Sequence, residues 1–296
     1  MPYATAKDGT ELYYKDWGKG RPVVLMHGWP LTGDTFDQAG MALVEKGFRA
    51  IIPDRRGFGR SDKPWDGNDY DTYTDDVAAI LDDAGVDDQV ALVGFSMGGG
   101  EVARFQTKYP GRTSAAVLIS SVVPYMAKTD DNPNGVPKEV FDQMTAGMKK
   151  DHKDFFPGFF KDFYGVGLVE KPVSQAVLDD SWRQTLMASL HNILAAAKAF
   201  ATTDFRPDLK NFGTVPTLVI HGDADKTVPI AATAREVAKA LPHAKLIEYP
   251  GSAHGVFETD KERLIGDLVA FLGTETSAID DGADQRSAIP MSETAR

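Results

Sequence analysis

Residues 89–103 read QVALVGFSMGGGEVA, an apolar run that leads to one serine set among four glycines. QVALV has the length and β-branched content of a strand, whereas EVARFQTKY after the glycines is typical of a helix. Ser96 therefore lies at a predicted strand-to-helix turn in a G-x-S-x-G pattern, which exposes a serine as a nucleophile. Gly94 and Gly98 suit this turn, because side chains two positions before and after a strained serine would collide. The alternative is a structural turn that happens to contain a serine.

The rest of the chain alternates between strand-like and helix-like segments. The apolar runs RPVVLMHG, FRAIIPD, AAVLISS, PTLVIHG and AKLIEYP have strand length, and helical patterns such as DDVAAILDDAG and AREVAKAL separate several of them. This rhythm predicts an α/β fold with a mainly parallel sheet and helices on both faces. The opening segment, residues 4–18, contains a DG turn between alternating segments and is predicted to form an antiparallel hairpin at the sheet edge.

The rhythm breaks over residues 124–206, which carry helical patterns and the aromatic cluster FFPGFFKDFYG. An insertion of this length between two core strands predicts a helical cap over one end of the sheet. We therefore expect a core formed by residues 1–123 and 207–273. The tail, residues 274–296, has few large apolar side chains and is predicted to be disordered.

Composition limits the classes of function. The chain has 296 residues and a net charge of -11, which argues against a nucleic-acid partner because phosphate binding needs a positive surface. With 0 cysteines it has neither disulfides nor a cysteine nucleophile. No uncharged apolar run approaches the ~18 residues of a membrane span, so we expect a soluble, cytoplasmic protein without a membrane partner. A homo-oligomer is left open.

A serine hydroxyl needs a histidine base and an orienting acid. In the fold that the turn implies, these follow in the order serine, acid, histidine. His254 follows the strand AKLIEYP, at the carboxyl end where sites form, whereas His243 precedes that strand. The strand PTLVIH is followed by GDADKTVP, which offers Asp223 and Asp225. We predict Asp225 as the acid and assign Asp223 to the turn, because the first carboxylate of such a pair more often accepts backbone N–H groups.

Two backbone N–H groups are predicted to form an oxyanion hole. One belongs to Met97, the residue after the nucleophile, and the other to the loop VLMHGWPL. Pro30 has no N–H and biases its predecessor toward an extended conformation, so Trp29 is the predicted second donor. Aromatic side chains of the cap can line an apolar pocket or simply pack the cap onto the core. The residues that we expect in the substrate pocket are Trp29, Pro30, Phe95, Phe159 and Phe163.

Several segments, in their order and rough spacing, resemble the α/β-hydrolase superfamily and, within it, the cofactor-free haloperoxidase, aryl esterase and perhydrolase group. They are HGWP, DRRGFGRSD, GNDYDTY, LVGFSMGGGEVAR, TDFRPD, HGDADKTVP and SAHG. The resemblance spans Tyr3 to Leu272 and implies the same catalytic residues, Ser96, Asp225 and His254. It also implies that no cofactor or metal is needed. The sequence agrees, since it contains neither an H-E-x-x-H nor a Walker pattern.

The predicted function is that of a serine hydrolase acting on small carboxylic esters, with acyl or aryl groups, through an acyl-enzyme. The resemblance implies a second outcome, in which hydrogen peroxide replaces water and yields a peracid that oxidises halide. The alternatives are a lactone or lactam hydrolase, a carbon–carbon bond hydrolase, and a binding protein without catalysis. The expected partners are a small ester and either water or hydrogen peroxide.

Overall fold

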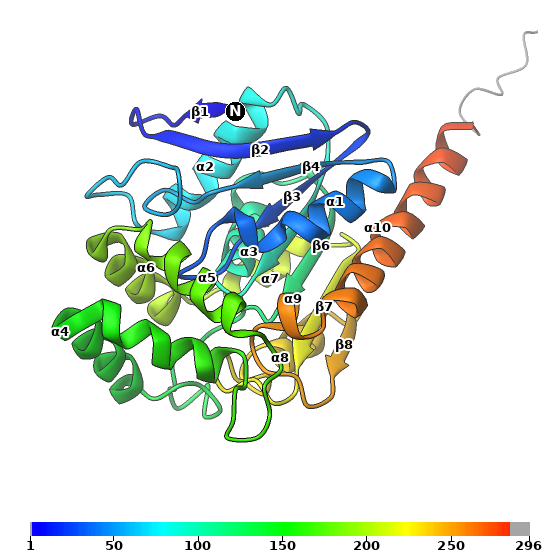
Figure 1. Ribbon diagram of the computed structural model, residues 1–296. Coiled ribbons are helices and arrows are strands. Elements are labelled where there is room, and N and C mark those ends of the chain that lie inside the picture. The colour runs from blue at the N-terminus through cyan, green and yellow to red at the C-terminus, as the bar shows by residue number, and fades with distance from the viewer. Residues whose placement is uncertain (1, 285–296) are drawn as a thin grey trace, which may run out of the picture.

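The computed structural model describes residues 2–284 and contains one sheet of eight strands (Figure 1). The strands are β1 (Tyr3–Thr5), β2 (Glu11–Gly18), β3 (Arg21–Met26), β4 (Phe48–Pro53), β5 (Val90–Phe95), β6 (Thr113–Ile119), β7 (Thr217–Gly222) and β8 (Lys245–Tyr249). Their order in the sheet is β1-β2-β4-β3-β5-β6-β7-β8. The pairs β1–β2 and β2–β4 are antiparallel and the others are parallel. The predicted hairpin is confirmed, with Ala4 opposite Leu12.

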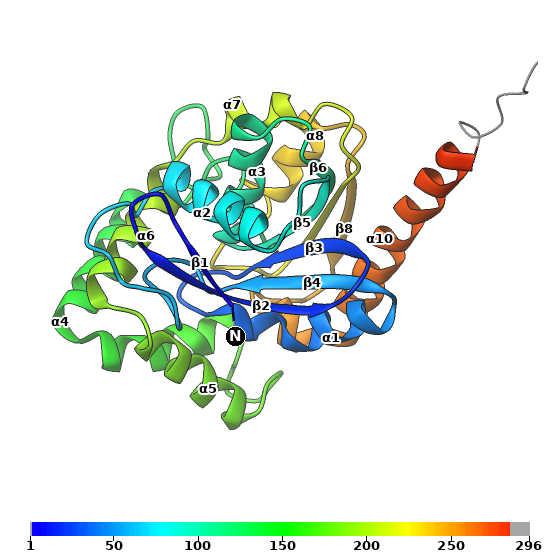
Figure 2. The same ribbon diagram turned by 90° about the horizontal axis from the view of Figure 1, so that it is seen from above.

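Helices cover both faces of this sheet. They are α1 (Asp37–Glu45), α2 (Tyr70–Asp83), α3 (Gly98–Lys108), α4 (Lys138–Phe163), α5 (Gln175–Leu186), α6 (Leu190–Thr202), α7 (Arg206–Leu209), α8 (Ala234–Ala240), α9 (Val256–Thr259) and α10 (Lys261–Asp284), with short 3-10 turns at Gly33–Phe36 and Lys210–Phe212. Figure 2 shows α2, α3 and α8 on one side of the sheet and α1 and α10 on the other. Every residue of β5 is buried, as its unbroken apolar run predicts for a central parallel strand. The predicted α/β fold class is confirmed.

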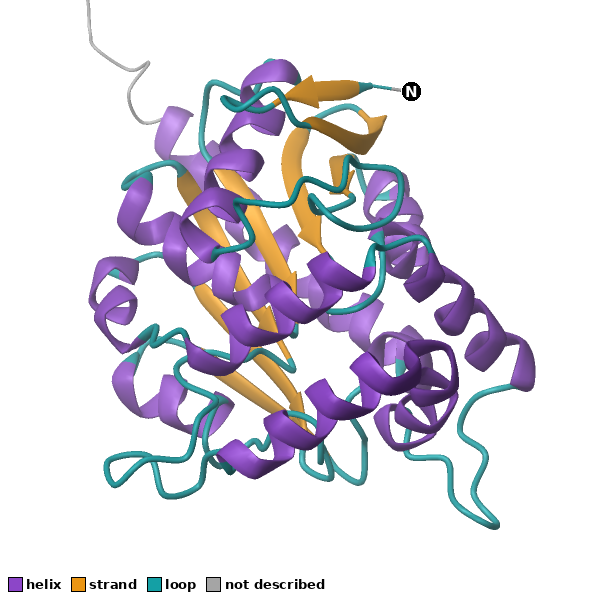
Figure 3. Ribbon diagram, turned by 90° about the vertical axis from the view of Figure 1, so that its left-hand side faces the viewer, coloured by secondary structure: helices purple, strands orange, loops and turns teal. Residues whose placement is uncertain are grey.

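The helices α4, α5 and α6 lie together at one side of the molecule, as Figures 1 and 2 show. Figure 3, in which the left-hand side of Figure 1 faces the viewer, shows helices in front of the strands. The helices α4, α5 and α6 all fall within residues 124–206, the segment predicted to form a cap, between β6 and β7. The helix α4 is interrupted at Asp151, whose backbone has non-helical φ and ψ of -160° and 95°. The Asp151 carboxylate accepts the N–H groups of Lys153 and Asp154, at 3.0 and 3.1 Å. Asp151 thus acts as the N-cap of the second half of α4, which contains the aromatic cluster, and stabilises the bend between the two halves.

The last helix extends beyond the boundary predicted from the sequence. We expected the ordered chain to end near residue 273, but α10 continues to Asp284. Residues 274–284 contain no proline, the residue that most strongly ends a helix. The rest of the predicted tail, residues 285–296, lies outside the described residues. Within the described part of the chain, no helix combines the length and the apolar character needed to cross a membrane.

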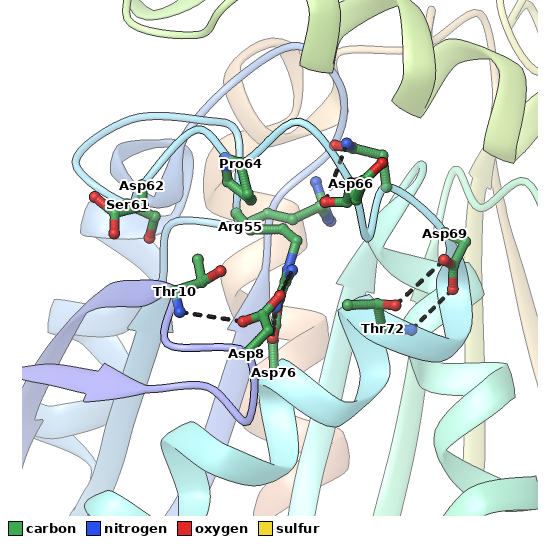
Figure 4. Close-up of polar contacts among 12 residues, drawn as sticks. Asp8, Thr10, Arg55, Ser61, Asp62, Pro64, Asp66, Asp69, Thr72 and Asp76 are labelled. Carbon is green, nitrogen blue, oxygen red and sulfur yellow. Dashed lines mark hydrogen bonds and ion pairs between the residues drawn. The ribbon is translucent and has the colours of Figure 1, made fainter.

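A buried arginine joins the hairpin, the loop after β4 and α2. Arg56 is 1% exposed, and its Nε and Nη2 donate to the two carboxylate oxygens of Asp76 on α2, at 2.5 and 2.6 Å. Its Nη1 donates to Asp8 of the hairpin turn, at 2.7 Å, and Asp8 also accepts the N–H of Thr10 (Figure 4). A Cβ at Gly67, which has φ +75°, would lie 2.5 Å from Nη1. Arg56 of the segment DRRGFGRSD thus lies against Gly67 of the segment GNDYDTY, so the two segments meet at the buried guanidinium.

Removing Asp76 should destabilise the fold strongly, because it leaves the buried guanidinium of Arg56 without its bidentate partner. We expect Asp76→Ala to lower the free energy of unfolding by ~3–5 kcal/mol. The matched control is Asp82→Ala on the same helix, since Asp82 is 68% exposed and its ion pair with Arg112 is worth less than ~1 kcal/mol. Urea unfolding at neutral pH gives both values, and equal losses in the two variants would contradict this account.

Asp8 should make part of this stability depend on pH. The hydrogen bond from Arg56 holds the pKa of Asp8 well below its usual range. A carboxylate with a depressed pKa in the folded state stabilises the fold above its unfolded pKa of ~3.9, and this contribution is lost as the pH falls through the folded pKa. The difference in unfolding free energy between the wild type and Asp8→Asn should therefore shrink between about pH 6 and about pH 3. A difference that grows on acidification would overturn the assignment.

Candidate active site

Ser96 occupies the turn between β5 and α3 with a left-handed backbone, φ 52°. This conformation is strained for a residue with a side chain and is typical of an exposed nucleophile. A Cβ at Gly94 would lie 2.4 Å from the carbonyl oxygen of Gly98, so the turn requires glycine there, as predicted. Gly98 has a different reason from the one predicted. A Cβ there would lie 2.3 Å from the carbonyl oxygen of Met26, at the end of β3.

The three residues predicted as a triad come together at the carboxyl ends of the strands. Ser96 Oγ lies 2.9 Å from His254 Nε2, and His254 Nδ1 lies 2.6 Å from Asp225 Oδ2. When Nδ1 carries the proton and donates to Asp225, Nε2 is free to accept the hydroxyl proton of Ser96. Asp223 points elsewhere, because its Oδ1 accepts the N–H of Gly251 at 2.6 Å. This arrangement can move a proton from serine to histidine beside a fixed negative charge.

Asp225 remains charged although it is buried. Burial raises its pKa, but the charge of His254 and hydrogen bonds from His221 and His254 outweigh this effect and hold the pKa well below its usual range. Its other oxygen, Oδ1, accepts the N–H groups of Thr227 and Val228 at 2.9 and 2.8 Å. The carboxylate can therefore orient His254 and stabilise an imidazolium without taking up a proton.

Two backbone N–H groups next to Ser96 have no acceptor among the described residues. They belong to Trp29 and Met97, the two predicted oxyanion donors. The loop that carries Trp29 touches the nucleophile, since a Cβ at Gly28 would lie 2.9 Å from the Cβ of Ser96. The carbonyl of Met97, which belongs to the next peptide unit, accepts a hydrogen bond from the hydroxyl of Tyr70 at 3.1 Å, and this helps to fix the backbone of Met97. Unpaired N–H groups in a buried turn are suited to an oxygen that gains negative charge.

Comparison with known proteins gives the family. A family model described as the alpha/beta hydrolase fold matches residues 21–261. The chain belongs to the α/β-hydrolase family. This confirms the family predicted from the ordered motifs.

Three relatives narrow the group to which this α/β-hydrolase is similar. A non-heme chloroperoxidase of Kitasatospora aureofaciens is 44% identical, and the match covers 92% of this chain and 99% of that protein. A bifunctional esterase/perhydrolase of Acinetobacter calcoaceticus is 42% identical, with the same coverage of both chains. The solved structure of a bromoperoxidase from Bacillus anthracis is 39% identical, with a TM-score of 0.87 over 92% of this chain and 100% of that one. The resemblance to the haloperoxidase, esterase and perhydrolase group is confirmed, and the predicted function agrees with these names.

An apolar cavity of about 560 Å³ opens onto Ser96 and His254. The other lining residues come from loops after the strands, including the long loop between β6 and α4, and from α4 and α6. They are Trp29, Val122, Met126, Val136, Val140, Phe141, Met144, Phe155, Gly158, Phe159, Asp162, Phe200, Lys226, Thr227 and Val228. Among the described residues, no group of His, Asp and Glu side chains is placed to hold a metal ion.

The predicted pocket residues divide into two sets. Trp29 and Phe159 line the cavity as expected, but Pro30, Phe95 and Phe163 do not. Phe95 and Phe163 are fully buried, and their ring centroids lie 5.1 and 4.8 Å from that of His254. They hold the imidazole in place from the core side, so their contribution is packing and not contact with a ligand. Pro30 is buried too and lies outside the lining.

His221 has a place in the site that sequence reasoning missed, since its position before a glycine indicated only a core or supporting group. It is fully buried, and its Nε2 lies 2.9 Å from the carbonyl of Val228, which fixes the proton on that nitrogen. The same nitrogen lies 3.3 Å from Asp225 Oδ2, the oxygen that also meets His254. The spacing of four residues between His221 and Asp225 is the signal that could have revealed this contact.

The rate at which an organophosphonate labels Ser96 should depend on how well the carboxylate of Asp225 orients His254. Asp225→Asn should slow labelling on the order of 10⁴-fold, because it disturbs the tautomer of His254. Asp223→Asn, two residues away, is the matched control and should leave the rate almost unchanged. His221→Phe should slow labelling by about tenfold, as loss of one hydrogen bond near a charge implies. Labelling rates of Asp225→Asn and Asp223→Asn that coincide would refute the assignment of the acid.

Proposed function

We propose that this protein is a serine hydrolase of small carboxylic esters that passes the acyl group through Ser96 to water or to hydrogen peroxide. The observation that carries the proposal is the hydrogen-bonded chain from Ser96 through His254 to Asp225 at the end of an apolar cavity. The unpaired N–H groups of Trp29 and Met97 support it further, because acyl transfer develops negative charge on the carbonyl oxygen.

The reaction follows from these positions. Ser96 Oγ attacks the ester carbonyl while His254 Nε2 takes its proton, and Asp225 stabilises the resulting imidazolium. The N–H groups of Trp29 and Met97 bind the oxyanion of the tetrahedral intermediate. His254 then gives the proton to the departing alcohol, and an acyl-Ser96 ester remains. Water, deprotonated by His254, attacks this ester and releases the carboxylic acid.

Hydrogen peroxide can replace water in the second half of the reaction. It attacks acyl-Ser96, the bond to Oγ breaks, and the products are free serine and a peracid. The peracid passes its outer oxygen to a halide ion, which gives a carboxylate and a hypohalous acid. The relatives named as chloroperoxidase, bromoperoxidase and esterase/perhydrolase support this second outcome.

The cavity supports small acyl or aryl groups as substrates. Its walls are mainly aliphatic and aromatic, and ligand cavities of ~300–1,000 Å³ hold molecules of drug-like size or smaller. The only charged lining groups among the described residues are Asp162, Lys226 and, when protonated, His254. An uncharged acyl group fits such a wall best, because burying a charge without a partner is costly.

The proposal involves two small-molecule partners, an ester and an acyl acceptor. The absence of nucleic acid among the partners, the location in the cytoplasm and a possible homo-oligomer stay predictions from the sequence. None of them enters the reaction described above.

Hydrolysis of p-nitrophenyl acetate tests the proposal directly. The wild type should release p-nitrophenol, and Ser96→Ala should lose nearly all of this activity, because Ser96 Oγ is the hydroxyl hydrogen-bonded to His254 Nε2. A parallel reaction with hydrogen peroxide and a peracid-specific dye should show peracid with the wild type alone. Circular dichroism confirms that the variant is folded. Full release of p-nitrophenol by folded Ser96→Ala would rule out acyl transfer through this serine.

A further inference from the structure

Two methionine side chains share the cavity with the reacting serine. Met126 follows β6 and Met144 lies on α4, and both line the cavity together with Ser96 and His254. Thioethers are the most easily oxidised apolar side chains, and they accept an oxygen atom without a catalyst. A product formed on Ser96 is therefore released into a space walled by two reducing groups.

Three other described methionines supply contrasts. Met41 and Met187 are 57% and 40% exposed on the outside of the molecule, and neither lines the cavity. Met148 lies four residues after Met144 on the same helix, but it is fully buried and outside the cavity lining. Met126 is only 2% exposed although it faces the cavity. The chain thus holds thioethers that differ in access to solvent and in access to the product of Ser96.

We propose that Met126 and Met144 are oxidised by the peracid that this protein makes, so that perhydrolysis modifies the wall of its own cavity. The inference rests on the proposed function, which supplies the oxidant. The methionine sulfur attacks the outer oxygen of the peracid, and the oxygen–oxygen bond breaks. The peroxy proton leaves with the carboxylic acid, the sulfur becomes a sulfoxide by losing two electrons, and the peroxy oxygen is reduced by them.

The product should change the cavity in a definite way. A sulfoxide places a polar oxygen among Val136, Val140 and Phe141, side chains that offer no hydrogen bond. An unpaired polar group in an apolar site is unfavourable and attracts water, so apolar acyl groups should bind less tightly. We therefore expect KM for the ester to rise as peracid accumulates, before kcat falls, because the hydrogen-bonded chain of Ser96 is not itself altered.

The order in which methionines react distinguishes this mechanism from ordinary oxidation. Hydrogen peroxide in bulk solvent reaches Met41 and Met187 first, because they are exposed. A peracid released inside the cavity meets Met126 and Met144 first. If Met126, which is nearly inaccessible to solvent, is oxidised before Met41, the oxidant comes from inside the cavity and not from bulk solvent.

Peptide mapping by mass spectrometry can measure this order. The protein is incubated with ethyl acetate and hydrogen peroxide, with peroxide alone, or as Ser96→Ala with both reagents, and sulfoxide at each methionine is plotted against peracid formed. Met126 and Met144 should gain sulfoxide in proportion to peracid in the first reaction only. In the first reaction Met41 and Met187 should gain sulfoxide more slowly than Met126 and Met144, because they meet only the peracid that has escaped into solvent, and Met148 should stay reduced.

The outcomes separate the inference from the function on which it rests. If peracid forms while Met126 and Met144 gain no more sulfoxide than with peroxide alone, the inference is wrong and the proposed function stands. If no peracid forms, the perhydrolase proposal fails and the inference fails with it. Oxidation of Met126 in Ser96→Ala at the rate of the wild type would also overturn the inference, since that variant makes no peracid.

Substitution of the two methionines gives an independent test. Leucine has nearly the same volume, so Met126→Leu with Met144→Leu should fold, and each protein is compared with its own initial rate. With ester and peroxide, the double variant should lose activity several-fold more slowly per peracid formed than the wild type. Met41→Leu is the control and should lose activity as fast as the wild type. Equal loss in the double variant would contradict the inference.

Discussion

The left-handed backbone of Ser96 is the constraint on which the rest of the site depends. A residue with a side chain adopts this conformation only where surrounding contacts over-determine it. Here the N–H of Ser96 donates to Ile119 at 2.8 Å, and its carbonyl accepts the N–H groups of Gly99 and Val122 at 3.1 and 3.2 Å. Both Ile119 and Val122 belong to β6 or the loop after it, so a neighbouring strand holds the turn. The hydroxyl is therefore aimed by the sheet and does not rely on a mobile loop.

The loop that carries Trp29, one of the two proposed oxyanion donors, is tied to the same core. Arg55 donates to the carbonyl of His27 at 2.7 Å and, through two nitrogens, to the carboxylate of Glu101 on α3. Its own N–H donates to His27 Nε2 at 3.0 Å, and burial lowers the pKa of this imidazole well below its usual value, which keeps it neutral. A buried arginine thus links the loop before Trp29 to the helix after the nucleophile. The reacting groups are positioned by the core, whereas most of the cavity wall belongs to α4, α6 and the loop before α4.

The sequence predicted the parts of the site that depend on chain order and failed where the direction of side chains decides. Strand ends could be placed from apolar runs, and this was enough to predict that Ser96, Asp225 and His254 lie together, as they do. The contact of Asp225 with His254 agrees with the choice of Asp225 over Asp223. The turn chemistry behind that choice does not separate the two residues, because Asp225 accepts two backbone N–H groups and Asp223 accepts one. The lining of the cavity could not be predicted, because residues on one face of a helix can meet different surroundings from one turn to the next. Phe159 reaches the cavity and Phe163, one turn later, packs on His254. The extension of α10 was missed because a polar helix end resembles a coil in composition.

The position of the helical insertion has a consequence for how such a protein can diversify. Most of the residues around the cavity lie in one stretch, from Val122 to Phe200, that leaves the sheet after β6 and returns before β7. Ser96, Asp225 and His254 all lie outside this stretch. A single continuous replacement between two fixed strand ends could therefore exchange the selectivity of the protein while its chemistry is inherited intact. Recombination between related genes would need only two crossover points, one after β6 and one before β7.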